Sequence, residues 1–203
     1  MTGTPPAAPD EDDEDEDEPG PQRSRMARTA RSFGGWLLLL AIGLTVATVA
    51  KAYVVTPFFI PSPSMVPTLS PGDRVVVDKL RYRIADPHRG DVVVFDKPAG
   101  AGGSAEVKNL IKRVIAVPGD EIEARKGVVY RNGRELDEPY LRPGTITTDI
   151  ARQRIRSGHY WVMGDNRVAS EDSRLFGPIP RSLLIGRALV LAWPPSRLGW
   201  IRG

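Results

Sequence analysis

The sequence predicts a mostly β protein, with an antiparallel β-sheet domain after a single N-terminal transmembrane helix. Two observations predict this class. One apolar stretch of spanning length lies at residues 34–55, and the later apolar runs are short and rich in valine or isoleucine. The 20 glycines and 19 prolines supply turns between those runs. The connections are too short for helical crossovers, so the strands should be antiparallel.

The N-terminal segment is highly charged. Residues 10–18 are nine consecutive acids, and no basic residue precedes Arg23. A run without apolar residues has nothing to bury, so we expect a solvated, disordered tail. The rest of the chain has 16 acids against 28 basic residues, which fits nucleic acid or anionic lipid as a partner. Because the basic residues do not gather with aromatics on one predicted face, we expect membrane lipid and no nucleic acid.

The apolar stretch has the features of a membrane anchor. No charged residue occurs from 34 to 50, and a helix over residues 34–55 is about 33 Å long at ~1.5 Å per residue. Trp36 and Tyr53 lie near opposite ends, as interface aromatics do. Lys51 lies near one end, where its stem can reach the headgroups.

The flanking charges predict the topology of the chain. Four arginines between residues 23 and 31 precede the anchor, so residues 1–33 should be a cytoplasmic tail and basic juxtamembrane segment. Residues 56–203 should then form an extracytoplasmic domain. A cleaved secretory signal is the alternative, because Ala50-Lys51-Ala52 resembles a cleavage site. The length of the span and the acidic sequence before it favour a retained anchor in the cell membrane.

Six segments beyond the anchor have the composition of strands. One of them contains Asn132-Gly133, a dipeptide that accepts positive φ at both positions and predicts a tight hairpin. The segments are residues 73–79, 91–95, 112–117, 127–136, 159–163 and 188–193.

The composition excludes several kinds of chemistry. Cysteine is absent, so the chain has no disulfide, thiol nucleophile or cysteine metal site. The two histidines have no motif around them: His88 is in an exposed-looking turn and His159 opens a predicted strand. Neither supports a Ser-His-Asp triad, and a histidine-rich metal site is not expected.

A lysine in an apolar strand offers another way to activate a serine. Of the six lysines, only Lys112 stands in such a setting, between Leu110-Ile111 and residues 114–117. Alternation puts Leu110, Lys112, Val114 and Ala116 on one face of a strand. Burial there disfavours the charged amine and lowers its pKa, so that it can take a proton from a serine hydroxyl.

Each motif has an ordinary interpretation when it is taken alone. Lys112 could end an edge strand, Ser62 and Ser64 could be turn residues beside proline, and residues 164–167 could form a turn with local hydrogen bonds. Taken together and in this order, they indicate a serine nucleophile, a lysine base and a polar scaffold.

The chain resembles the bacterial type I signal peptidases, membrane-bound serine proteases that remove signal peptides from exported preproteins. The resemblance runs from the anchor nearly to the C-terminus and leaves out the acidic tail. It rests on five boxes: Ser-x-Ser-Met-x-Pro-Thr-Leu at 62–69, Gly-Asp at 72–73, Lys-Arg at 112–113, Pro-Gly-Asp at 118–120, and Gly-Asp-Asn-Arg with Ser-x-Asp-Ser-Arg at 164–174.

The resemblance implies a role for each matching residue. Ser64 is the nucleophile, Lys112 is the general base, and Ser62 helps to bind the oxyanion together with the backbone N–H of Ser64. Ser170 orients the lysine. Asp172 and Arg174 form a supporting ion pair, with Asp165 and Arg167 nearby.

The resemblance also implies the substrate and its pockets. Ile60, Leu69 and Ile111 match positions that line small apolar pockets, which admit alanine-sized side chains before the cut. It implies no metal and no cofactor, and we expect a monomer. One departure concerns the last box, where Asp-Asn is frequent in the family and Val168-Ala169 stand here. Pro63 between the two serines is a second variation.

Two alternatives differ in function. The first is a Ser-Lys membrane protease with another task, such as self-cleavage near Ala52 or a dedicated substrate. The second is a membrane-tethered β-domain that binds emerging chains without cutting them. Phe58, Phe59 and Ile60 are an apolar group that we expect to dip into the membrane interface.

Overall fold

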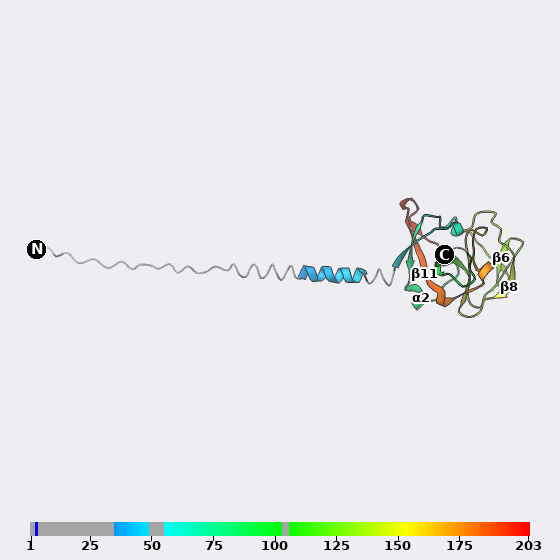
Figure 1. Cartoon of the computed structure of the whole chain (residues 1–203), viewed down its shortest axis with the longest axis horizontal. Helices are drawn as coiled ribbons and strands as arrows, with labels where there is room; N and C mark the ends of the chain where they lie inside the picture. The colour runs from blue at the N-terminus through cyan, green and yellow to red at the C-terminus, as the bar shows by residue number, and fades with distance from the viewer. Residues whose placement is uncertain (1–2, 4–34, 49–54, 103–105) are drawn as a thin grey trace. The chain divides into compact units, whose positions relative to one another are not determined.

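The computed structural model describes residues 3, 35–48, 55–102 and 106–203. Residues 35–48 are helical and lie within the predicted anchor. Within the described residues, no helix has both the length and the apolar character needed to cross a membrane. Val55 is not helical but opens the first strand, so the predicted helix end at residue 55 is wrong. The predicted acidic tail and basic segment lie almost wholly outside the described residues (Figure 1).

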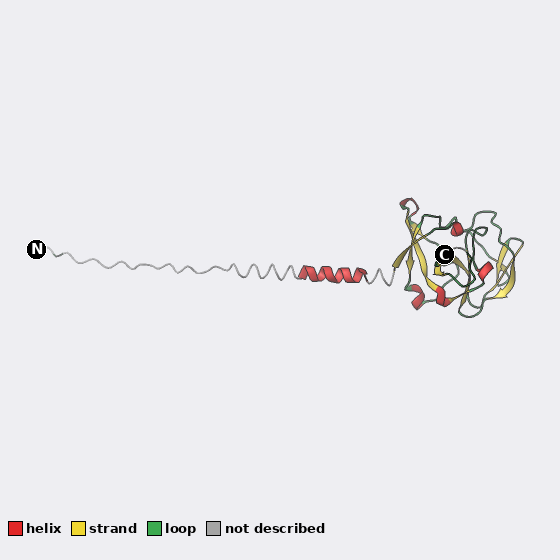
Figure 2. Ribbon diagram, viewed as in Figure 1, coloured by secondary structure: helices red, strands yellow, loops and turns green. Residues whose placement is uncertain are grey.

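Residues 55–102 and 106–203 form two antiparallel sheets, and short helical turns connect strands of the larger sheet (Figure 2). The larger sheet has eight strands in the order β1-β2-β11-β3-β4-β9-β10, with β12 paired to β11. Its strands are β1 (Val55–Phe59), β2 (Arg74–Asp78), β3 (Val92–Asp96), β4 (Asn109–Ala116), β9 (His159–Met163), β10 (Ile179–Pro180), β11 (Leu184–Trp193) and β12 (Gly199–Trp200).

The smaller sheet has four strands in the order β7-β6-β5-β8. Its strands are β5 (Glu121–Arg125), β6 (Val128–Arg131), β7 (Arg134–Glu135) and β8 (Ile150–Arg154). Asn132 and Gly133 connect β6 to β7 with φ of 54° and 76°, as the predicted tight hairpin requires. The helical turns are η1 (Pro63–Met65), α2 (Arg81–Ile84), α3 (Ser173–Phe176), η2 (Arg181–Leu183) and η3 (Pro195–Arg197).

All six predicted strand segments contain strands, and the mostly antiparallel β class is confirmed. Five strands were not predicted, namely β1, β5, β8 and the two-residue strands β10 and β12. β1 continues the apolar composition of the anchor region, while β5 and β8 carry a charged residue at nearly every second position. The alternation in β5 buries Ile122 and Ala124 and exposes the rest to varying degrees, as a strand with one solvated face does.

Strand β4 is the central structural element, because it contributes to all three apolar clusters of the core. Ile111 packs with the valines of β2 and β3, Val114 packs with Phe95 and Val162, and Ile115 packs with the smaller sheet. A bulge between Val114 and Ala116 shifts the register against β9. Ala116 therefore packs with Ile115 in the same cluster, and the predicted strict alternation ends at Val114.

Candidate active site

The turn η1 carries Ser64 and is held by the loop after β9. Pro63 begins the turn with its fixed φ. The backbone N–H of Asn166 donates to the carbonyl of Ser64 at 3.0 Å, and its side-chain amide donates to the carbonyl of Pro63 at 3.2 Å. Thr68 Oγ1 donates to Asp165 at 2.5 Å. The Gly-Asp-Asn-Arg box therefore binds the serine turn directly.

Lys112 reaches Ser64 from β4. Its Nζ lies 2.8 Å from Ser64 Oγ, and the two side chains are 48 positions apart in the chain. Both residues are buried, with 3% of Lys112 and 5% of Ser64 exposed. Burial lowers the pKa of Lys112 to about 8, although the carboxylates of Asp172, Glu171 and Asp165 oppose that shift. An unprotonated amine at this distance can accept the proton of the serine hydroxyl.

Two further serines lie beside the pair. Ser62 Oγ is 3.2 Å from Ser64 Oγ. Ser170 Oγ is buried and has no hydrogen-bond partner among the described residues, so its expected bond to Lys112 stays a prediction. A Cβ at Gly164 would overlap Ser170 Oγ and come within 2.5 Å of the Ser64 carbonyl. Only glycine allows this close approach of three chain segments.

Asp172 and Arg174 form the ion pair that the sequence predicts. Arg174 Nε donates to Oδ1 at 2.8 Å and Nη2 donates to Oδ2 at 2.9 Å. Asp172 also accepts from the N–H of Gly164 at 3.0 Å and caps α3 through the N–H of Arg174 at 3.2 Å. Burial alone would raise the pKa of Asp172, but Arg174 and the hydrogen bond from Gly164 act together against burial, and the pKa is lowered.

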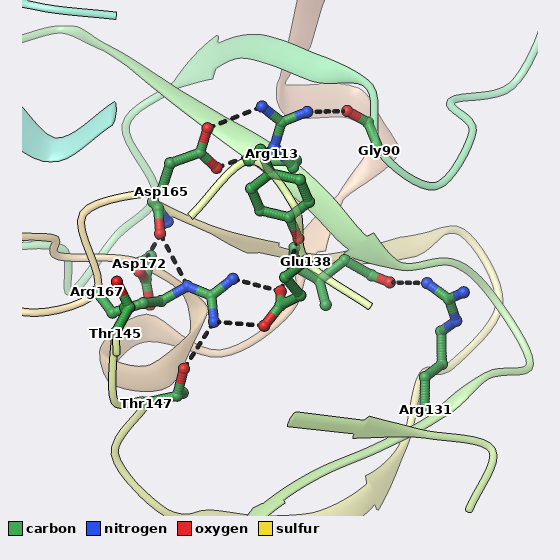
Figure 3. A network of polar contacts seen from close by, with 12 residues as sticks. Gly90, Arg113, Arg131, Glu138, Thr145, Thr147, Asp165, Arg167 and Asp172 are labelled. Carbon is green, nitrogen blue, oxygen red and sulfur yellow. Dashed lines mark hydrogen bonds and ion pairs between the residues drawn. The ribbon is translucent and has the colours of Figure 1, made fainter. Parts of the chain in front are cut away.

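Asp165 and Arg167 do not pair with each other but with residues that the sequence analysis gave no role. Arg113 donates to Asp165 through Nε at 2.9 Å and Nη2 at 2.8 Å. Arg167 donates to Glu138 through Nη1 at 3.0 Å and Nη2 at 2.5 Å (Figure 3). The charged Arg113 next to Lys112 was a signal in the sequence. Glu138 gave no such signal, because its Asp-Glu-Pro-Tyr run has the composition of an ordinary turn.

An apolar cleft of about 300 Å³ opens beside the serine and lysine. Ile60 and Ile111 line it, as predicted. Leu69 does not line the cleft but is fully buried in the cluster behind these two residues. Ile60 is only 2% exposed, so the expectation that it dips into the membrane interface is wrong. Ala169 lines the cleft while Val168 is 90% exposed, so the two variant positions of the last box differ in environment.

Along this cleft, one edge of β4 pairs with no strand that the structure describes. Residues 109–112 pair with β3, while pairing with β9 begins only at Arg113. An unpaired edge beside a cleft can accept an extended peptide as an added strand. Among the described residues, no group of three His, Asp or Glu side chains is arranged to hold a metal ion.

The fold and the site define a class of protein, a β-sheet domain in which a buried lysine amine takes the place of histidine beside a serine hydroxyl. The family model described as signal peptidase, peptidase S26, matches residues 33–193. The chain therefore belongs to the signal peptidase family.

Several named relatives are similar over most of the chain. "Probable signal peptidase I-1" of Synechocystis is 42% identical, over 79% of this chain and 83% of that protein. "Signal peptidase I" of Mycobacterium tuberculosis H37Rv is 35% identical, over 97% and 84%. "Signal peptidase IB" of Staphylococcus aureus N315 is 33% identical, over 79% and 90%. A solved signal peptidase I from Enterococcus faecalis V583 is 30% identical and covers 51% of this chain and 97% of its own, with a TM-score of 0.43.

Proposed function

We propose that this chain is a type I signal peptidase, a membrane-bound serine endopeptidase that removes N-terminal signal peptides from exported preproteins. Membership of the signal peptidase family supports this function. The observation that carries the mechanism is the 2.8 Å contact between Lys112 Nζ and Ser64 Oγ, both buried.

In the proposed mechanism Lys112 takes the proton of Ser64 as the hydroxyl oxygen attacks the scissile carbonyl. The hydroxyl of Ser62 and the N–H of Ser64 donate to the developing oxyanion, and such donors are commonly worth about 3 kcal/mol each. The protonated Lys112 then gives its proton to the leaving amine, and a water molecule hydrolyses the acyl-enzyme by the same steps. Ser170 keeps the amine aimed at Ser64, and Asp172 with Arg174 supports that loop.

The cleft supports cleavage after small residues. Its walls near the serine come from Ile60 and Ile111, with Leu69 packed behind them. A preprotein segment that pairs with the open edge of β4 would place alternate side chains against this apolar wall. Large side chains would collide with residues that have no room to move in a packed core.

The location follows from the anchor and from the outer face of the larger sheet. In our proposal the apolar span that begins at residue 34 crosses the membrane once and ends before the strand that Val55 opens, with residues 1–33 cytoplasmic and residues 56–203 outside. Phe59 and Trp193 both neighbour Arg74 across the sheet and are 61% and 53% exposed. They share their face with Trp200, which is 78% exposed. Exposed aromatics of this kind suit a membrane interface, and the protein acts there as a monomer.

Cleavage of a preprotein in liposomes by wild type, Ser64→Ala and Lys112→Ala across pH tests the proposal. We expect cutting after an Ala-x-Ala site by wild type alone. If both variants cut as well as wild type, the serine and lysine are not the catalytic pair. If wild type releases only its own N-terminal segment near Ala52, the alternative of a self-cleaving protease is favoured. If none of the three cuts, the chain is a binding domain.

A further inference from the structure

One short segment after β7 contacts both buried arginines of the site. The hydroxyl of Tyr140 donates to Glu138 Oε1 at 2.6 Å, and the same carboxylate accepts two bonds from Arg167. The ring of Tyr140 lies 4.0 Å from the guanidinium carbon of Arg113. Figure 3 shows Glu138 facing Arg167 while Arg113 faces Asp165. Glu138 and Tyr140 belong to neither the serine turn nor the lysine strand.

Arg167 links this segment to the serine turn. Its Nε donates to the carbonyl of Gly164 at 3.0 Å, and Gly164 lies so close to the Ser64 carbonyl that a Cβ would clash. Asn166, two residues after Gly164, donates its backbone N–H to the Ser64 carbonyl. The position of Arg167 therefore fixes the loop that supports Ser64.

Arg113 links the segment to the lysine strand. Only 1% of Arg113 is exposed, and besides Asp165 it donates to the carbonyls of Gly90 at 2.9 Å and Arg202 at 2.8 Å. The Tyr140 ring covers one face of this guanidinium, a contact that is attractive and excludes water. Since adjacent residues of a strand point to opposite faces, fixing Arg113 also fixes how β4 presents Lys112.

The buried ion pair between Arg167 and Glu138 explains why changes in this segment should disturb the active site. The side chain of Arg167 is fully buried and that of Glu138 is 10% exposed, and this carboxylate is the ion-pair partner of Arg167 within the described residues. A buried cation that loses its partner is strongly destabilised where it stands. Arg167 would move to find water or another acceptor, and the Gly164 carbonyl would lose its donor.

We infer that Glu138 and Tyr140 are positioning residues of the active site, which hold Arg167 and Arg113 and thereby keep Ser64 and Lys112 in register. This inference rests on the proposed function, because its effect is on the serine–lysine pair. It gives the smaller sheet a role in catalysis although none of its strands lines the cleft.

The test compares Glu138→Gln and Tyr140→Leu with wild type in preprotein cleavage by the full chain. The matched control is Glu123→Gln, which removes a glutamate bonded to an arginine, Arg152, in the same sheet but away from the site. Tyr140→Phe keeps the ring over Arg113, and Glu138→Asp keeps the charge if the glutamine variant does not fold. kcat and KM are measured per acylatable active site, and the unfolding midpoint is measured beside them.

We expect kcat per active site to fall on the order of ten- to a hundred-fold in Glu138→Gln and Tyr140→Leu, as small misplacements of reacting groups cause. KM should change little, because the cleft residues are untouched. Glu123→Gln should keep wild-type kcat, whereas Tyr140→Phe, which loses the hydroxyl bond to Glu138 but keeps the ring over Arg113, and Glu138→Asp should fall between. The inference is overturned if both main variants keep wild-type kcat per active site, or lose activity only in proportion to folded protein. A wild type that does not cut the preprotein overturns the proposed function itself.

Discussion

Burying the charged amine of Lys112 costs free energy, and the same burial lowers its pKa, which is what the proposed base requires. Its ordinary pKa of 10.5 would leave the amine charged at neutral pH, whereas burial lowers the pKa to about 8. The carboxylates around it, with Asp172 the strongest and then Glu171, act against the shift but do not cancel it. In the proposed mechanism, this pKa leaves the lysine base partly unprotonated near neutral pH.

The pH dependence of cleavage should report this pKa. Because only the unprotonated amine can accept the proton of Ser64, we expect kcat/KM to rise with pH through about 8 and then level. Glu171→Gln removes a negative charge that favours the protonated amine, so the rising limb should move to lower pH. Glu171 is exposed, so the move should be small, and it should be weaker at high salt because salt screens exposed charges. A limb that does not move at low salt would contradict this assignment.

Replacing the lysine should stabilise the protein while it abolishes cleavage. Below pH 8 both the folded and the unfolded chain hold the proton, so the folded state bears the full cost of the lowered pKa. Between about 8 and 10.5 the folded state loses its proton first, and stability rises with pH. Lys112→Met should raise the free energy of unfolding at pH 7 by on the order of 1–3 kcal/mol. Urea unfolding should show the gain over wild type shrinking as pH rises from about 8 to 10.5, and a gain that is constant with pH would argue against this account.

Among the elements, the short helix α3 depends on Asp172 for its start. Asp172 caps the helix, pairs with Arg174 and accepts the N–H of Gly164, and it is fully buried. We expect Asp172→Ala to destabilise the fold by roughly 3 kcal/mol, since it strands a partly buried cation and an N–H. Urea unfolding of wild type and Asp172→Ala at pH 7 measures the difference. A helix cap alone contributes about 1 kcal/mol, so a loss below that value would contradict this prediction.

Acid should remove the same contribution. The folded-state pKa of Asp172 is lowered, so its stabilisation is present above the ordinary carboxyl pKa of about 3.9 and is lost as pH falls through the lowered value. The difference in unfolding free energy between wild type and Asp172→Asn should therefore be constant from neutral pH to about 4 and disappear in stronger acid. A difference that persists in stronger acid would mean that the charge of Asp172 is not the cause.

The sequence was most informative where the cause of structure is local. The Asn132-Gly133 hairpin and the valine-rich strands β2, β3 and β4 follow from backbone preference and from burial pattern, and both are visible within ten residues. Strand β1 was hidden because its apolar residues continue those of the anchor. The bulge after Val114 was invisible, because it depends on pairing with β9 rather than on any residue in β4.

The motifs of the site could be predicted from the sequence, but the hydrogen bonds and ion pairs between distant residues could not. Ser64, Lys112 and the pair Asp172–Arg174 could be named because boxes of known spacing carry them. The partners of Arg113 and Arg167 lie 52 and 29 positions away, and no local pattern selects Glu138 among the acidic residues. Leu69 was expected in a cleft wall and instead packs behind it, because an apolar residue in a motif does not say on which side of the core it lies.

At the scale of the whole molecule, the catalytic cleft and the aromatic face meet on one strand. Phe58 and Phe59 line the cleft, and Phe59 also shares the outer face of the sheet with Trp193 and Trp200. A substrate anchored in a bilayer presents its cut site at the membrane surface. If the aromatic face lies on that surface, the open edge of β4 meets the substrate without a search through solution, an advantage of the kind that tethering supplies.

The double variant Trp193→Ser, Trp200→Ser should separate membrane contact from chemistry. Both side chains are more than half exposed, so their loss should leave folding and the Ser64–Lys112 contact intact. We expect cleavage of a short peptide in detergent to match wild type, and cleavage of a membrane-inserted preprotein in liposomes to fall several-fold as interfacial aromatic area is lost. The exposed pair Ile84→Ser, Ile146→Ser, which lies outside the cleft and the aromatic face, serves as the control. Equal loss in both assays would mean that the tryptophans support the fold, and no loss in liposomes would mean that this face does not touch the bilayer.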